Sequence, residues 1–377
     1  MLVKLVWDGS EITVPEEMGC PHSGQMIGTD GEQLIELSCR ICYDSVGTGR
    51  ASAETIAHVL EARHLSVLEH YNRTIQLDFG QLFGTEMAGG LMLFPALFNR
   101  PGLWVRPTVG GLRLTMNART AYEWFEWTSR MKDATDPAIH GLFATVDALG
   151  AIVWRLWMDI MPMVFHDRSD VPDREWALLR THLDDAKFVT PETTHEEWVS
   201  LYISGSRGMS HELVRHGDWT AISQRSTRYV EENESDWAWH PAIAHYLSDA
   251  AVEADQDEFR AAIHDCEKHA KRAYAIIRDH LETWLRPRCE IKRDARKQAR
   301  GAARGALGNA LNTELIFSAS ADQWLHILRM RGSLGADAEI REIAAAAHAI
   351  LSKSRYGNRF SGLTPSPSPD GLGQVLT

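Results

Sequence analysis

The pattern of apolar and polar positions is most regular in the second half of the chain. Between residues 257 and 285, apolar side chains from Phe259 to Trp284 recur every three or four positions, which predicts a long amphipathic helix. Further helices are predicted at residues 53–63, 289–305, 320–330 and 336–353. The second of these is very basic.

Shorter segments with other patterns lie between these helices. Residues 72–80 alternate like a strand, and 198–203 and 314–318 also predict strands. We expect a polar turn at 64–70, and a helical turn at 210–216 with Ser210 as its N-cap. The mixture of helices and strands indicates an α+β fold.

The middle of the chain differs in composition from both ends. From about residue 81 to 200, Trp, Gly and Pro crowd together, which suggests a separate layer or subdomain. We therefore predict a discontinuous domain of residues 1–80 and 198–360, an inserted subdomain at 81–197, and a Pro/Ser/Gly-rich tail at 361–377 that is disordered. Seven of the 13 tryptophans lie in or beside the insertion: Trp104, Trp124, Trp127, Trp154, Trp157, Trp176 and Trp198.

The overall composition narrows the functional classes. The chain has 377 residues, is 44% hydrophobic, and carries a net charge of −12, which argues against a general nucleic-acid binder. We expect no secretory signal. We also expect no membrane span, because the best candidate segment, 149–165, contains Arg155 and Asp159. Five cysteines without a framework predict a reduced, cytoplasmic protein. The Cys39-x-x-Cys42 pair is more typical of buried thiols than of a metal site.

The segment Arg215 to Tyr229, RHGDWTAISQRSTRY, is the strongest candidate for chemistry. It combines three arginines with His216, Gln224 and several hydroxyl side chains, a mixture that a folding core does not need. Guanidinium groups bind phosphate in a bidentate manner, and amides and hydroxyls can hydrogen-bond to the edge of a ring. The segment therefore predicts a nucleotide pocket, although a surface helix end with paired charges is the alternative.

Two other groups of polar residues could contribute to a site. His64, Ser66, Glu69 and His70 could bind a metal, but their spacing equally fits a polar turn that caps the preceding helix. In the basic segment 289–305, Lys292, Arg293 and Lys297 fit a solvated face. Arg304 lies among Gly and Ala residues that permit close approach to a ligand or a subunit. Arg331 has a similar setting, although it could simply complement a helix dipole.

Three blocks in order resemble the flavin-dependent thymidylate synthases, the ThyX family. Residues 211–230, HELVRHGDWTAISQRSTRYV, resemble that family's signature, in which RHR is followed after seven residues by Ser. HLSVLEH at 64–70 resembles the family's GHxSxxEH block, and RGAARGAL at 300–307 with LRMRGSLGADAEI at 328–340 resembles its closing block. The resemblance covers about 35–85 and 198–353, and it implies a ThyX-like fold with helices packed on an antiparallel-rich sheet.

The resemblance implies roles for individual residues. Deoxyuridine monophosphate (dUMP) would be bound by Glu212, Arg215, Gln224, Ser226, Arg228, Arg304 and Arg331, with Ser226, Arg228 and Arg331 as the catalytic residues. FAD would be bound by His64, Ser66, Glu69, Arg215 and His216. The implied reaction is reductive methylation of uracil at C5, with methylenetetrahydrofolate as carbon donor, reduced FAD as hydride donor and NADPH as reductant. A homotetramer with shared active sites is also implied, with no metal, nucleic acid or membrane partner.

The chain departs from the family pattern at several positions. Gly217 replaces the last residue of RHR, and one extra residue precedes Ser226. Ser320 and Asp322 stand where the family has Asn-x-Arg, and Gly335 stands in place of a histidine. We hypothesise that Asn117 and Arg119, in the insertion, supply the missing Asn-x-Arg contact to FAD in trans; the alternative is a helix cap and a surface arginine.

These departures keep other functions open. A related enzyme could act on UMP or dCMP instead of dUMP, or could release a 5-hydroxymethyl product. A protein of another class could bind the nucleotide without catalysis, having lost the flavin.

Overall fold

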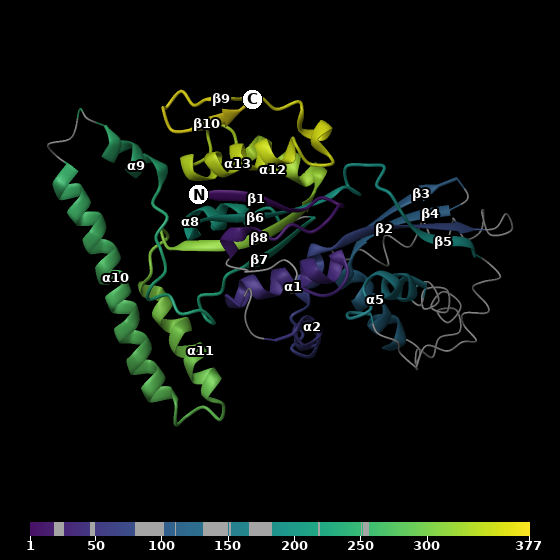
Figure 1. Cartoon of the computed structure of the whole chain (residues 1–377), viewed down its shortest axis with the longest axis horizontal. Coiled ribbons are helices and arrows are strands. Elements are labelled where there is room, and N and C mark those ends of the chain that lie inside the picture. The colour runs from purple at the N-terminus through teal and green to yellow at the C-terminus, as the bar shows by residue number, and fades with distance from the viewer. Residues whose placement is uncertain are drawn as a thin grey trace.

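The computed structural model describes residues 1–18, 26–45, 50–79, 102–109, 111–130, 150, 152–165, 183–217, 219–249, 251 and 256–377. In these parts of the chain, helices pack on two antiparallel sheets that lie side by side (Figure 1). The α+β class expected from the sequence is confirmed.

The central sheet has the strand order β1-β6-β8-β7, and each neighbouring pair is antiparallel. Successive side chains of a strand point to opposite faces, so Leu315 and Phe317 of β8 enter one core while Ile316 enters the other. The sheet is thus apolar on both faces and must be covered on both. Its strands are β1 (Leu2–Trp7), β6 (Trp198–Ser206), β7 (Thr220–Gln224) and β8 (Asn312–Ser320).

Helices cover the two faces of the central sheet (Figure 1). On one face, Trp324 of the first C-terminal helix and Ile340 of the second pack against the strands. On the other face, Leu34 and Ile35 pack against Trp198 and Tyr202. The covering elements are α12 (Ala321–Arg331) and α13 (Ala338–Leu351) on the first face, and α1 (Asp30–Tyr43), α2 (Ser52–Glu61) and the 3-10 helix η3 (Leu65–His70) on the second.

The second sheet, with the order β3-β4-β2-β5, lies beside the central sheet (Figure 1). Strand β2 follows η3 directly and pairs with β4 and β5, which come from the segment expected to be inserted. The two sheets share one core, and the proposed domain boundaries stay a prediction. The elements are β2 (Asn72–Phe79), β3 (Leu103–Thr108), β4 (Gly111–Asn117), β5 (Leu183–Val189) and α5 (Ala118–Arg130).

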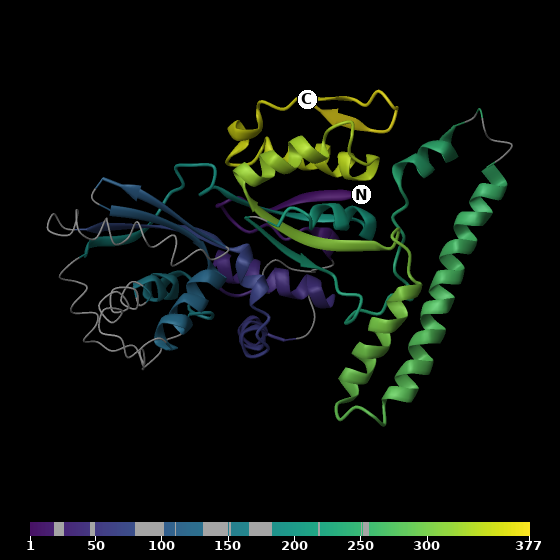
Figure 2. The ribbon, with the colours of Figure 1, turned by 180° about the vertical axis from the view of Figure 1, so that it is seen from behind.

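A helical hairpin stands at the other side of the central sheet (Figure 2). It consists of α10 (Gln256–Leu285) and α11 (Lys292–Ala303), close to the residue ranges that the sequence predicts. In α10, only Gln256 and Tyr274 are buried. Most of this long helix is therefore open to solvent in the single chain. The remaining short elements are η1 (Glu16–Met18), α8 (Arg207–Leu213), α9 (Pro241–Ser248), η6 (Arg304–Ala306) and η7 (Gly357–Phe360).

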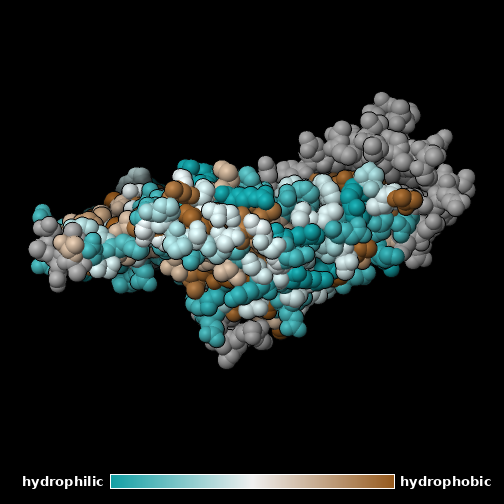
Figure 3. Space-filling view, turned by 90° about the horizontal axis from the view of Figure 1, so that it is seen from above, coloured by the Kyte–Doolittle hydropathy of each residue, from teal (hydrophilic) through white to brown (hydrophobic). Residues whose placement is uncertain are grey.

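The C-terminal residues 361–377 are ordered, in contrast to the expectation of disorder. Strands β9 (Pro365–Pro367) and β10 (Gln374–Leu376) form a hairpin over α13. Buried Arg341 of α13 donates hydrogen bonds to Ser368 Oγ at 2.9 Å and Asp370 Oδ2 at 2.6 Å. Pro, Ser and Gly suit a tight hairpin as well as a disordered tail, so composition alone misleads here. Seen from above the view of Figure 1, the described surface is mostly hydrophilic, with scattered hydrophobic residues (Figure 3).

Two local expectations also need correction. Ser206, not Ser210, is the N-cap of α8, because its Oγ accepts a hydrogen bond from the Met209 amide at 3.0 Å. Residues 64–70 are not a simple polar turn: Leu65, Val67, Leu68 and His70 of η3 are buried. Among the described residues, no helix is long and apolar enough to cross a bilayer.

His70 fastens η3 to the middle of the central sheet. Its side chain is fully buried, with Nδ1 2.7 Å from Ser318 Oγ on β8 and Nε2 2.9 Å from Ser223 Oγ on β7. Ser318 also bonds Ser200 of β6 at 2.6 Å, and Trp198 Nε1 donates to the His70 carbonyl oxygen at 2.8 Å. We call this set the His70 network. Burial lowers the pKa of His70 from 6.5 to about 3, so the ring is neutral in the folded protein.

The His70 network predicts a specific dependence of stability on pH. Because the folded pKa of about 3 is below the unfolded value of 6.5, the unfolded chain binds the extra proton first. The contribution of neutral His70 to the free energy of unfolding is therefore fully present above pH 6.5. Below that pH it falls by about 1.4 kcal/mol per pH unit. Urea unfolding at pH 6 and pH 4.5 should give a steeper pH dependence for the native protein than for His70→Gln, and equal slopes would contradict this account.

Candidate functional site

The arginine-rich segment of the sequence folds into α8, β7 and a turn. The start of α8 is fixed by Ser206, which donates from its Oγ and its amide to Glu339 of α13 at 2.6 and 2.9 Å. After β7, the amides of Tyr229 and Val230 donate to the Ser226 carbonyl oxygen at 3.1 and 2.9 Å, closing a turn. The polar side chains of the segment therefore occupy fixed positions at both ends of β7, rather than a loop without regular structure.

At one end of β7, Glu212, Arg215, His216 and Arg331 form a group that we call the Arg331 cluster. Arg331 ends α12, and its Nη1 donates to the Glu212 carboxylate while Nη2 donates to the Glu212 carbonyl oxygen at 3.2 Å. Its Nε donates to His216 Nε2 at 2.9 Å. Arg215 lies 3.1 Å from Glu212 Oε1, with 66% of its side chain exposed. The cluster joins the second and third sequence blocks.

The protonation of His216 follows from this geometry. Because Arg331 donates to Nε2, that nitrogen must act as an acceptor, so the ring is neutral and carries its proton on Nδ1. Burial, followed by the charges of Arg331 and His326, lowers the pKa of His216 and outweighs the opposite effect of Glu212. His216 therefore holds the Arg331 guanidinium by hydrogen bonding without adding charge.

At the other end of β7, a cavity of about 600 Å³ opens between α1, α2 and α11. Tyr43 and His64 lie on it with Tyr43 Oη and His64 Nδ1 2.6 Å apart and their rings stacked. Arg228 and Lys297 lie over the ring of Tyr229 at 6.0 and 4.9 Å from its centroid. None of the residues that line this cationic cavity is acidic. The basic residues among them are Arg40, Arg50, His58, His64, Arg228, Arg293, Arg296, Lys297 and Arg300.

Some of these cations have structural partners, and others do not. Arg40 is paired with Glu36 at 2.7 Å, and Arg300 with Glu231 at 3.0 Å. The side chains of Arg293 and Arg296 are exposed and make no hydrogen bond or ion pair to any described residue. An excess of positive charge on a concave surface favours an anionic ligand, and guanidinium binds phosphate and carboxylate groups with two parallel hydrogen bonds.

Gln224 is the last residue of β7, and Ser226 follows it in the turn that leads to Arg228. Gln224 Nε2 donates to Ser210 Oγ and Thr313 Oγ1, both at 3.0 Å. The Ser226 amide donates to the Cys42 carbonyl oxygen at 3.0 Å, which ties the turn to α1. The Arg304 side chain is exposed and has no hydrogen-bond or ion-pair partner among the described residues. Burial, followed by the charge of Arg304, lowers the pKa of half-buried Arg207.

The third group of expected site residues lies where η3 meets α5. Arg119 Nη1 donates to Glu69 Oε1 at 2.5 Å, and its Nε donates to Glu123 at 2.9 Å. Burial raises the pKa of Glu69, against the effect of Arg119. Asn117 Oδ1 accepts from the Thr120 amide at 2.8 Å and so caps α5. Ser66 is exposed on η3. Glu69 and Arg119, which the sequence connects only through flavin, are in direct contact within one chain.

Several positions act differently from what the sequence suggests. Arg225 is structural, because it lies within 3.4 Å of Asp44 and 3.7 Å of Glu232. Ser320 is buried and caps α12, with its Oγ accepting from the Gln323 amide at 3.2 Å. Asp322 is half exposed and 3.9 Å from His195. A side chain placed at Gly217 or Gly335 would meet nothing within 4 Å.

The cysteine pair and possible metal-binding groups are the remaining candidates for chemistry. Cys39 and Cys42 are free thiols on α1, and burial raises the pKa of both, to about 12 for Cys39. They are therefore protonated and unreactive at neutral pH. Across the described parts of the chain, no group of three or more His, Cys, Asp or Glu side chains is arranged to hold a metal ion.

Comparison with known proteins identifies the family. The model of a family described as "Thymidylate synthase complementing protein" matches residues 198–354, which include the Arg331 cluster and Arg228. A flavin-dependent thymidylate synthase of Mycobacterium bovis (strain BCG / Pasteur 1173P2) is 36% identical over 188 residues, or 45% of this chain and 67% of that protein. The chain belongs to the flavin-dependent thymidylate synthase family.

Other members of the family match over a shorter span. The flavin-dependent thymidylate synthase of Mycobacterium sp. (strain KMS) is 40% identical over 152 residues, and that of Mycobacteroides abscessus is 35% identical over 151 residues. Each match covers 39% of this chain and 56% or 55% of the relative. The chain thus spans about half the length of these two curated relatives.

The sequence did not single out every residue of the cationic cavity. Tyr43 and His58 were missed because each lies on a helix that looks ordinary by itself, and Arg50 because it stands alone before α2. The one available signal was the unusual basicity of 289–305, which fits a solvated face equally well. Only the packing of α11 near α1 and α2 turns these side chains toward a common cavity.

Proposed function

We propose that this protein is a flavin-dependent thymidylate synthase that converts dUMP to dTMP by reductive methylation at C5. Methylenetetrahydrofolate would supply the carbon and NADPH the reducing equivalents. Family membership supports this, and one observation carries it: His64 of the first block and Arg228 of the second line the same cationic cavity. A flavin and a nucleotide both bring phosphate to such a cavity.

The nucleotide would be held by Glu212, Arg215, Gln224, Ser226, Arg228, Arg304 and Arg331. Arg228 is exposed on the cavity wall and keeps donors for a phosphate or a uracil carbonyl oxygen. Arg331 is held by Glu212 and His216, so its guanidinium is fixed in orientation before substrate arrives. A fixed cation beside a carbonyl oxygen stabilises negative charge that develops there, which activates C5 for attack. Ser226, Arg228 and Arg331 are the proposed catalytic residues.

The donor set fits FAD. His64 and Tyr43 present stacked rings beside the cationic wall, a combination that suits a flat isoalloxazine ring joined to a diphosphate. The proposed flavin contacts are His64, Ser66, Glu69, Arg215, His216, Asn117 and Arg119. When bound and reduced, FAD would supply the hydride for the methyl group. The cysteines that the structure describes as free fit a reducing, cytoplasmic location.

The main prediction concerns the product. Purified protein incubated with dUMP, methylenetetrahydrofolate, NADPH and FAD should yield dTMP, seen by mass spectrometry as a gain matching one methyl group. Arg228→Gln should lower kcat/KM by at least about a hundredfold, because the lost cation faces charge that develops in the reaction. Arg272→Gln, which changes an exposed arginine on α10, should leave the rate unchanged.

Other outcomes of the same assay would replace the proposal. A mass gain matching a hydroxymethyl group would make the protein a hydroxymethylase, and turnover of UMP or dCMP in preference to dUMP would change the substrate. Failure to bind FAD, with retained nucleotide binding, would indicate a non-catalytic nucleotide-binding protein. The cap role of Ser320 and the acidic Asp322, at positions where the family carries flavin contacts, give this last outcome its weight.

We propose that the active form is a homotetramer with shared sites. Arg228 lines the cationic cavity, whereas Arg331 and Glu212 are not among its lining residues. If all three serve one nucleotide, different chains must supply them. The open helix α10 also exposes Ile276, Ile277 and Trp284, an apolar surface of the kind that subunits bury.

Mixing two inactive variants tests whether the sites are shared. Arg228→Gln and Arg331→Leu should each be inactive alone. After unfolding and refolding together in equal amounts, about a quarter of the native activity should return, because a quarter of the sites would receive both native arginines from different chains. Light scattering should give the mass of a tetramer. A mixture as inactive as its parents would place both arginines in one chain's site.

The contact of Arg119 with flavin has its own test. Arg119→Gln should weaken retention of FAD by about tenfold, because a charged hydrogen-bond donor to the flavin is lost. Asn117→Ala is less informative, since Asn117 also caps α5. Absorbance of bound flavin after gel filtration is the measurement, with Arg272→Gln as control. Unchanged flavin occupancy in a folded variant would limit Arg119 to its ion pairs with Glu69 and Glu123.

A further inference from the structure

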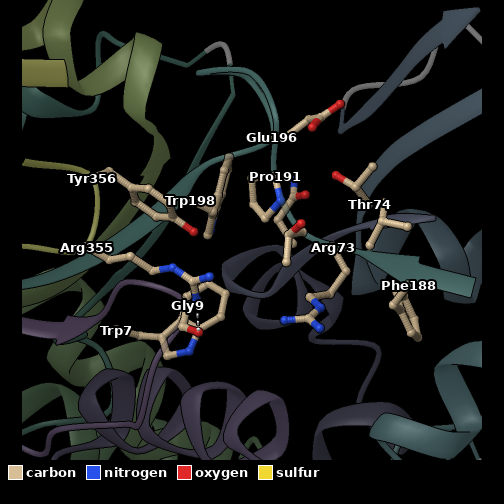
Figure 4. Close-up of a pocket in the computed structure, with 13 residues that line it drawn as sticks. Trp7, Gly9, Arg73, Thr74, Phe188, Pro191, Glu196, Trp198, Arg355 and Tyr356 are labelled. Atoms are coloured by element: carbon tan, nitrogen blue, oxygen red, sulfur yellow. Dashed lines mark hydrogen bonds between the residues drawn. The ribbon is translucent and has the colours of Figure 1, made fainter. Parts of the chain in front are cut away.

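A second cavity, of about 260 Å³, lies where the two sheets meet. It is separate from the cationic cavity, and none of its lining residues belongs to the proposed catalytic site. We call it the inter-sheet cavity (Figure 4). It is lined from the end of β1, the start of β2, the end of β5, the start of β6 and the segment after α13, by Trp7, Gly9, Asn72, Arg73, Thr74, Phe188, Val189, Thr190, Pro191, Glu196, Trp198, Arg355 and Tyr356.

Aromatic rings form much of the wall. Trp7, Trp198 and Tyr356 lie together on one side, and Phe188 lies on the other (Figure 4). Trp198 is held in place by its hydrogen bond to the His70 carbonyl oxygen at 2.8 Å. Rings that are fixed on opposite sides of a narrow cavity favour a flat ligand, because it can contact several of them at once.

Two guanidinium groups also line the cavity. Arg73 and Arg355 enter it from opposite sides (Figure 4). The Arg73 side chain makes no hydrogen bond or ion pair to any described residue, and its guanidinium lies 5.6 Å from the ring centre of Phe188. Arg355 uses one donor on the Gly9 carbonyl oxygen at 3.1 Å. Glu196, the acidic residue on the wall, is already engaged by Arg113 at 2.7 and 2.9 Å.

Asn72 supplies an independent sign of a missing partner. It is 3% exposed and lines the cavity, yet neither its amide nitrogen nor its amide oxygen has a hydrogen-bond partner among the described residues. A buried polar atom left unpaired is costly, because it has lost its hydrogen bonds to water and gained none in return. Such an amide offers both a donor and an acceptor, which is what the edge of a heteroaromatic ring requires.

Gly9 permits the tight packing on the Trp7 side. Its φ is +89°, and a Cβ there would lie 2.9 Å from the Tyr356 hydroxyl and 3.5 Å from Arg355 Nη1. Burial raises the pKa of Tyr356; the charges of Arg355 and Arg73 oppose that rise, whereas those of Glu197 and Asp8 add to it. The cations, the phenol and the amide thus face one small space.

We propose that the inter-sheet cavity is a second binding site, for a flat heteroaromatic ring that carries a negatively charged group. The ring lies against the aromatic wall, Arg73 pairs with the anion, and Asn72 hydrogen-bonds the ring edge. A cavity of about 260 Å³ holds a mononucleotide or the ring portion of a folate, but not a whole dinucleotide. The ligand is therefore a nucleotide or a folate bound away from the catalytic site.

Calorimetric titration of the full-length protein tests this site. The ligands are dTMP, 5-formyltetrahydrofolate and inorganic phosphate, each added to Arg228→Gln so that binding at the cationic cavity is suppressed. One of the two ring-bearing ligands should bind, and adding Arg73→Gln should weaken it by at least about tenfold because a charged hydrogen bond is lost. Adding Arg272→Gln instead should have no effect.

A second variant separates the ring from the charge. Phe188→Leu should weaken the ring-bearing ligand and leave phosphate binding as it is. If neither dTMP nor 5-formyltetrahydrofolate shows binding that depends on Arg73 in a variant with native unfolding temperature, the site does not exist. Phosphate binding as tightly as the ring-bearing ligands would remove the aromatic wall from the proposal. These results do not depend on the catalytic activity of the protein.

Discussion

The hydrogen bonds of one buried, neutral histidine connect the parts of this fold that bear on its chemistry. His70 bonds a serine on each of two neighbouring strands, and its own carbonyl oxygen accepts from the tryptophan that begins β6. Because both ring nitrogens are occupied, η3 is held in one orientation, with His64 at one end and Glu69 at the other. The block at 64–70, for which we propose contacts to flavin, is therefore positioned by the centre of the sheet rather than by its own contacts.

Beyond this anchor, the chain keeps the residues that we propose to be catalytic in separate places. Arg331 is oriented by Glu212 and His216, whereas Arg228 lies across β7 on a wall of cations. In isolation the cationic wall repels itself, and a phosphate would relieve that repulsion. A protein of net charge −12 can thus present a strongly positive site without becoming a general binder of nucleic acid.

Local spacing predicted several of the regular elements, since amphipathic periodicity and alternation depend only on neighbours, but α1 and β1 were not predicted. The observed ends of α10 and β2 lie within one or two residues of their predicted ends. The sequence could not distinguish Arg225 from Arg228, because structural pairing with Asp44 and Glu232 depends on contacts between distant segments. The same holds for α11, whose basic face is solvated or functional depending on what packs opposite. The tail was mispredicted because its order rests on Arg341, a residue outside it.

The hydrogen bond from Trp198 to the His70 carbonyl oxygen has a further meaning for the architecture. The chain departs from the central sheet after His70 and rejoins it at Trp198. The two ends of the intervening segment are therefore in direct contact, with Trp198 Nε1 2.8 Å from the His70 carbonyl oxygen. A segment whose two ends lie side by side does not need to alter the register of the central strands. A change in its length also adds little to the entropy cost of bringing its ends together. Further along, the contacts of Arg119 with Glu69 and of the Met163 amide with Glu32 fasten this segment to the elements beside the central sheet, so the second sheet is held by several contacts as well as by its two ends.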